Sequence, residues 1–136
     1  MKKHVIIFWV SVFMFFTGFG QSGGTDTRDI VKRITLINKF ESEYVGFAGS
    51  ASKQYKNYKR LLETATEKEL QALLSHKNAA VRVYVFMALQ KKNPTLAKKA
   101  SKKLLNDKEI IRTLQGCIGG VTTVRELVAT IVLNQD

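Results

Sequence analysis

Cysteine and histidine are scarce in this 136-residue chain, and their scarcity excludes several kinds of site. Cys117 is the only cysteine, so no disulfide can form within the chain and the fold must depend on an apolar core. The only histidines are His4 and His76. Together with Cys117 they provide three ligands, which cannot by themselves build a four-ligand structural zinc site. We therefore expect neither a metal site nor a cofactor.

Catalytic motifs are also missing. The sequence contains no HExxH pair, CxxC motif, phosphate loop or GxSxG elbow. The carboxylate pairs Glu41 with Glu43 and Glu67 with Glu69 are two residues apart, and such residues do not share a helix face. We interpret Cys117 as a small buried hydrophobic residue, since a nucleophilic cysteine would need a neighbouring histidine or basic pocket. The sequence thus predicts a protein that is not an enzyme and indicates no small-molecule substrate.

The N-terminal segment "MKKHVIIFWVSVFMFFTGFG" has the order of a secretory signal peptide: basic start, apolar run, small residues. Its apolar run, residues 5–19, is shorter than the ~20 residues of a spanning helix, which argues against the alternative of an uncleaved anchor. We predict a signal peptide at residues 1–20, cleaved near Gly20, and an exported, periplasmic or secreted protein. Residues 21–28 are then a flexible leader, and residues 29–136 a helical domain.

Acidic residues are outnumbered, with 11 Asp and Glu against 22 Lys and Arg and a formal net charge of +11. Cleavage would remove two lysines and no acid, which leaves +9. A basic surface attracts polyanions such as nucleic acid, anionic lipid or acidic protein. The simpler interpretation is a solvated surface of mixed charge with an excess of lysine.

Apolar residues recur at helical spacing through most of residues 29–136. We expect helices from residue 29 through the apolar positions Phe40 and Tyr44, then over about 51–64, 66–76, 79–91, 94–105 and from 123 onward. Thr66 and Glu69 fit a capping box at the start of the third. Residues 108–122 fit a short helix, an extended segment or a turn equally well.

The stretch "HKNAAVRVYVFMALQKKNP", residues 76–94, decides the fold class. "VRVYVF" alone has strand character, because valine, tyrosine and phenylalanine favour strands. The window is long, however, it begins with a good N-cap, and helical patterns flank it, so we predict a buried central helix. We expect its single charge to leave the core and pair with a carboxylate or with backbone carbonyls of a neighbouring helix. The residues given a structural role here are Asn78, Val81, Arg82, Val85, Ala88 and Leu89.

About six helices joined by short loops predict an all-α fold, either a short HEAT-like α-solenoid or a compact bundle. The expected pairs are the first helix with the second, the third with the fourth and the fifth with the last.

"LSHKNAAVRVYVFMAL" resembles a HEAT-type repeat, with its short turn, Asn78, Val81 with Arg82, and Ala88 with Leu89. Residues 45–120 resemble a group of small exported Bacteroidetes proteins that combine "GFAG…SKQY", "ELQALLSHKNAAVR" and "GCIG". The resemblance implies macromolecular binding, since HEAT-like repeats mostly bind other macromolecules, and it brings no catalytic mechanism. The group itself is largely without an assigned activity. Only the repeat around Asn78 has a recognisable pattern, so a compact bundle remains an alternative to the solenoid.

Lysines supply the candidate partner-binding residues. A basic face is expected around the turn between two helices, and a second strip at Lys53, Lys56, Lys59 and Arg60. We expect an exported binding or scaffold module of the cell envelope with a protein partner. The alternatives are binding of an anionic polymer through the basic face, and immunity toward a secreted toxin. The six residues of the basic face are Lys91, Lys92, Lys98, Lys99, Lys102 and Lys103.

Overall fold

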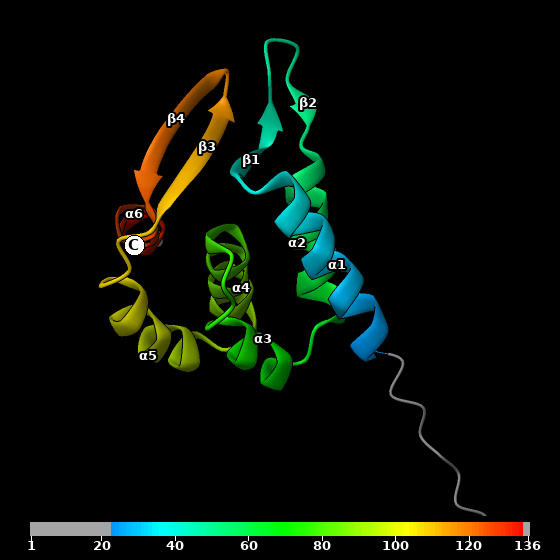
Figure 1. The fold of residues 1–136 in the computed structure, drawn as a ribbon, viewed down its shortest axis with the longest axis vertical. Coiled ribbons are helices and arrows are strands. Elements are labelled where there is room, and N and C mark those ends of the chain that lie inside the picture. Colours follow the sequence, from blue (N-terminus) through cyan, green and yellow to red (C-terminus); the bar gives the residue numbers. More distant parts are fainter. Residues whose placement is uncertain (1–22, 135–136) are drawn as a thin grey trace, which may run out of the picture.

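The computed structural model describes residues 23–134 of the chain (Figure 1). These residues form six helices and four strands. The helices are α1 (Gly23–Ile37), α2 (Lys53–Thr64), α3 (Glu67–Leu73), α4 (Ala79–Lys92), α5 (Pro94–Leu104) and α6 (Val124–Leu133). The strands are β1 (Phe40–Val45), β2 (Ser50–Ala51), β3 (Ile110–Gly116) and β4 (Ile118–Thr123). The expected signal peptide and its cleavage site lie outside the described residues.

The helices pack around α4. Helix α1 packs against α2 and α3 against α4, as the sequence predicts, whereas α5 packs mainly against α4 and only to a smaller extent against α6, its predicted partner. Helix α4 also contacts α1, α2 and α6, so it lies in the middle of the helical layer (Figure 1). The helix expected over the strand-like run is confirmed: nearly every residue from Ala79 to Leu89 is buried. Asn78 caps it, with its Oδ1 accepting a hydrogen bond from the Val81 amide at 3.1 Å.

The all-α prediction is wrong, because the connections within the first and third helix pairs form one four-stranded sheet. The strand order is β2-β1-β3-β4, with β1 parallel to β3 and antiparallel pairing at both sides. The first connection lies between α1 and α2, and the second between α5 and α6. In a solenoid each repeat contacts only its neighbours. Here the parallel pairing of β1 with β3 joins the connection of the first helix pair directly to the connection of the third, without passing through the second pair.

Strand β1 replaces the helix that we expected to continue through Phe40 and Tyr44. Asn38 has a φ of 48° and so ends α1 in the left-handed conformation, which asparagine tolerates better than most residues. Its amide still bonds the Ile34 carbonyl at 3.0 Å. The chain then leaves in a new direction, and the ring of Phe40 stacks on Tyr84 of α4 with centroids 5.4 Å apart.

Tyr84 fastens the sheet to the central helix. Its hydroxyl accepts a hydrogen bond from the Glu41 amide at 2.8 Å and donates one to the Glu41 carbonyl at 3.0 Å. Tyr84 is fully buried, and Tyr58 of α2 stacks on its ring at 5.7 Å. A buried hydroxyl that satisfies two backbone groups offsets the loss of hydration at this end of β1.

The segment that the sequence left unassigned, residues 108–122, contains most of the β3–β4 hairpin. Gln115 pairs with Ile118, so Gly116 and Cys117 form a two-residue turn. Only Gly116 of these two has a positive φ, 57°, which is the pattern of a type II′ turn. Cys117 is therefore exposed at a hairpin tip, and its interpretation as a buried hydrophobic residue is wrong.

Helix α1 begins before the expected domain start. Residues 23–28 are helical rather than part of a flexible leader, and Thr27 is buried within this first part of α1. The same part is held to α2 by an ion pair between Asp26 and Arg60 at 3.1 Å. No helix within residues 23–134 is both long and apolar enough to cross a membrane.

Candidate functional site

Arg82 pairs with carboxylates and backbone carbonyls, but it stays buried and its partners lie in connecting segments, whereas we expected the charge to leave the core and pair with a neighbouring helix. Its Nε donates to Asp107 Oδ2 at 2.8 Å, and its Nη2 donates to Glu109 Oε2 at 2.6 Å. Its Nη1 donates to the backbone carbonyls of His76 and Lys77, at 2.7 and 3.1 Å. The side chain thus ties the central helix to its own preceding turn and to the segment between α5 and β3. Burial opposes its charge, but the bonds to the two carboxylates raise the pKa of Arg82 above its ordinary value.

Because every nitrogen of its guanidinium group donates to a protein oxygen, Arg82 is not poised to bind a ligand. The other residues assigned to structure, Asn78, Val81, Val85, Ala88 and Leu89, all belong to the N-cap or buried faces of α4. These six residues build the frame rather than a site.

Two of the six lysines of the predicted basic face make hydrogen bonds to neighbouring elements. Lys92 donates to the Ala65 carbonyl at 2.5 Å and Lys103 donates to Ser75 Oγ at 2.9 Å, so each holds a neighbouring helix pair. The other four, Lys91, Lys98, Lys99 and Lys102, are exposed and make no ion pair with any residue in 23–134. Residues 70–106 contain no Asp or Glu, but Glu67 of α3 reaches the turn between α4 and α5, where it accepts a hydrogen bond from Asn93 at 3.0 Å.

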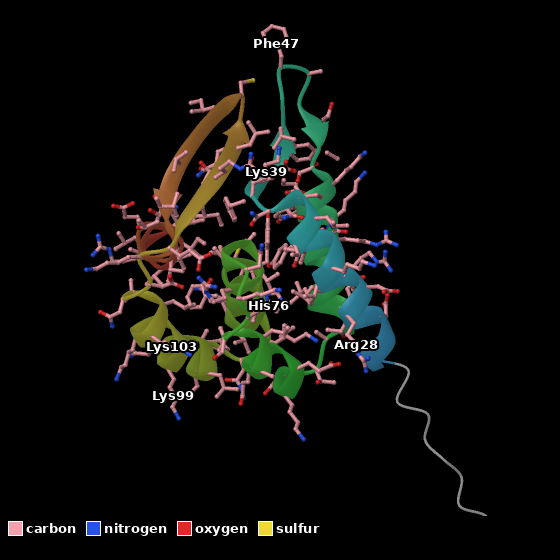
Figure 2. All side chains as sticks on the ribbon, viewed as in Figure 1. Arg28, Lys39, Phe47, His76, Lys99 and Lys103 are labelled. Carbon is pink, nitrogen blue, oxygen red and sulfur yellow. The ribbon has the colours of Figure 1, made fainter. Side chains whose placement is uncertain are left out.

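A second candidate surface is the free end of the sheet, which sequence reasoning missed. The turn of the β1–β2 hairpin and the turn of the β3–β4 hairpin lie at the same end, because the Gly46 amide bonds the Gly116 carbonyl at 3.0 Å. Both hairpins extend beyond the helices, and Phe47 forms one extremity of the molecule (Figures 1 and 2). Phe47 is 101% exposed, Ile118 77% and Tyr44 58%. Large apolar side chains gathered on a projecting end are typical of interaction sites.

Strand β4 adds an open backbone edge to this surface. Among the described residues β4 pairs only with β3, so its outer backbone groups have no strand partner. Its sequence, IGGVTT, contains no charged residue and no proline, the usual devices that protect an edge from strand pairing. Val121 pairs with Arg112, so it shares a sheet face with Ile110, and each of these two apolar residues is 68% exposed. The opposite face carries Ile111, which is buried in the core.

We call the exposed residues Tyr44, Phe47, Ile118 and Val121, together with the β4 edge, the sheet-end surface. Ile110 lies at the other end of the β3–β4 hairpin, away from the turns. Two sequence signals mark it in retrospect: an aromatic residue between Gly46 and Gly49, and β-branched residues on either side of a Gly-Cys dipeptide. The second is a hairpin pattern.

Within residues 23–134, no group of three or more His, Cys, Asp or Glu side chains is placed to hold a metal ion. No known protein family matches this chain, and no curated protein matches it.

Proposed function

We propose that this chain is an exported, non-catalytic binding module that takes a protein partner on its sheet-end surface. The observation that carries the proposal is the coincidence of exposed apolar side chains with an unprotected strand edge at one projecting end. The helices then act as the rigid support. Export rests on the signal-peptide pattern of residues 1–20.

The binding mode that fits this surface is addition of a partner strand to β4. Main-chain hydrogen bonds along the open edge would supply affinity, and alternate side chains would supply specificity. Val121 and Ile110 offer apolar contact on one face of the extended sheet. The turn that carries Phe47 follows β1, which lies two strands from β4, a lateral separation of about 10 Å at the usual strand spacing, so one partner can also cover Phe47 as an aromatic anchor.

Site-specific photo-cross-linking in the producing cells tests this proposal. A photoreactive residue placed at Val121 or Phe47 should capture one discrete protein. The same residue at Leu133, an equally exposed apolar position on α6, should not capture it. Equal cross-linking from Leu133 would contradict the assignment of the surface.

The captured partner is then titrated against variants of the purified protein. Val121→Lys puts a charge on the open edge, and Phe47→Ser removes the anchor; each should weaken binding about tenfold or more, the range of interface hot spots. Both residues are exposed, so circular dichroism and urea unfolding should stay unchanged. Unchanged affinity in both variants would overturn the proposal.

A second function, binding of an anionic polymer, is favoured by the basic face alone. Its four exposed lysines lie in a stretch without acids, and binding through them should weaken steeply with salt. Lys98→Glu with Lys102→Glu should abolish binding of a fluorescent oligonucleotide at low salt, whereas the charge-matched pair Lys32→Glu with Lys59→Glu, on α1 and α2, should change it little. Equal losses in both variants would indicate only a non-specific response to net charge.

A further inference from the structure

A cleft of about 450 Å³ lies between the C-terminal half of α1 and the N-terminal half of α2. It shares no residue with the sheet-end surface or with the basic face, although the β1–β2 hairpin connects its two helices. Figure 2 shows nitrogen-tipped side chains along the outer side of these two helices. The lining residues are Arg33, Leu36 and Ile37 from α1, and Lys53, Lys56, Asn57 and Arg60 from α2.

Helical spacing explains why these side chains converge. Arg33, Leu36 and Ile37 are three and four residues apart, and the α2 residues follow the same three-and-four pattern, so each helix presents one continuous face to the cleft. Four of the seven lining residues are cations and none is an acid. Arg60 alone has an ion pair within residues 23–134, to Asp26 at 3.1 Å, and both partners of that pair are roughly half exposed. Exposed pairs of this kind are weak and can be exchanged for another anion.

The charge of this cleft is unfavourable for the protein on its own. Lys53 and Lys56 lie in the first two turns of α2, whose first turn contains no acid. The N-terminal end of a helix carries partial positive charge, so cations there are disfavoured and a bound anion would be stabilised. An apolar wall accompanies the charge, because Leu36 is 76% exposed and Ile37 is half-buried beside it.

We infer that this cleft binds a small amphiphilic anion: a phosphate or carboxylate head with a short apolar chain. The head is matched by Arg33, Lys53 and Lys56, and the chain by Leu36 and Ile37. The volume lies within the range of small-molecule sites, roughly 300–1,000 Å³. Arginine adds paired donors suited to phosphate or carboxylate oxygens, and lysine adds mobile point charge.

Four probes separate the contributions of head and chain. Octyl phosphate and octanoate carry both; inorganic phosphate has only the head, and octanol has only the chain. Titration followed by amide chemical shifts should give saturable binding of the two amphiphilic anions, with the shifts gathered on residues 33–37 and 53–60. Inorganic phosphate and octanol should each bind at least about tenfold more weakly.

Three variants locate the site. Arg33→Gln and Lys56→Gln should each weaken octyl phosphate binding about tenfold, as expected for loss of one charge-assisted contact. Leu36→Ser should weaken octyl phosphate binding while leaving the weak binding of inorganic phosphate unchanged. Lys59→Gln is the matched control, since Lys59 is an exposed lysine of the same helix that does not line the cleft.

Several outcomes would overturn the inference. Equal affinity for octanol and octyl phosphate would show that the cations play no part, and equal affinity for inorganic phosphate would show that the apolar wall plays none. An equal loss in Lys59→Gln would reduce the effect to net charge. Binding to vesicles of anionic phospholipid without binding to octyl phosphate would identify a membrane-surface contact in place of a small-ligand cleft. None of these results depends on a partner at the sheet-end surface.

Discussion

Replacing Arg82 with methionine removes four hydrogen bonds, two of which join the central helix to the segment between α5 and β3. Arg82 is 8% exposed, and its guanidinium donates to two carboxylates and two carbonyls. A hydrogen bond that involves a charged group contributes about 1.5–3 kcal/mol, but bonds from one side chain are not additive. The Glu109 side chain is 50% exposed and the Asp107 side chain 20%, so water can solvate both after the change. We therefore expect a loss of about 2–4 kcal/mol in the free energy of unfolding.

Urea unfolding followed by far-ultraviolet circular dichroism measures this loss. For a chain of this size the urea concentration at the midpoint of unfolding should fall by roughly 1–3 M. The corresponding free energy is a large part of the total stability of a small domain. Arg82→Lys should lie between the wild type and Arg82→Met, because an ammonium group keeps the charge but cannot hold two carboxylates and two carbonyls at once. Lys102→Met makes a similar change at an exposed position and should shift stability by less than about 0.5 kcal/mol.

If Arg82→Met unfolded at the same urea concentration as Lys102→Met, the reasoning would be refuted. A buried ion pair can be replaced without loss when both partners become apolar. In Arg82→Met, however, Asp107 and Glu109 keep their charges. A double-mutant cycle with Glu109→Gln should therefore show a coupling of about 0.5–3 kcal/mol.

Three further predictions concern single side chains. Tyr84→Phe should lower the free energy of unfolding by about 1–3 kcal/mol, since it leaves the buried amide and carbonyl of Glu41 without a partner; an unchanged urea midpoint would contradict this. Burial and two neighbouring cations lower the pKa of His76, whose Nδ1 accepts a hydrogen bond from the Asn78 amide. As the pH falls, His76 is therefore protonated in the unfolded chain before it is protonated in the folded protein. Stability should then fall as the pH drops through about 6.5 toward the folded pKa, and His76→Gln should flatten that part of the profile. Cys117 should react with a thiol reagent in the native protein nearly as fast as in urea, whereas protection would show that the hairpin tip is covered.

The helical layer was predictable because its signals are local. The capping box of Thr66 and Glu69 is present, with the Thr66 amide donating to the Glu69 carboxylate at 2.8 Å. Asn93 and Pro94 begin α5 as expected, and Thr123 begins α6. Each of these caps depends on residues within three positions of one another, so it can form without a contact to a distant segment.

The sheet was not predictable on the same grounds. Phe40 and Tyr44 extend the helical periodicity of α1, and only Asn38 interrupts it. The strand character of β1 becomes favourable once β3, about 70 residues later, supplies its hydrogen-bond partners. A pairing of that separation leaves no periodic trace in a single sequence.

The sequence by itself determined the six helices, the pairing of the first with the second and of the third with the fourth, and the pairing of the Arg82 charge with carboxylates and carbonyls. It did so because amphipathic periodicity and capping are properties of neighbouring residues. The tertiary structure alone decided that two connections form one sheet and that Cys117, Phe47 and Val121 are exposed. It alone gathered cations of α1 and α2 around one cleft. The physical reason is that backbone hydrogen bonds between strands, and charges on facing helices, are satisfied or left open only after distant segments have met.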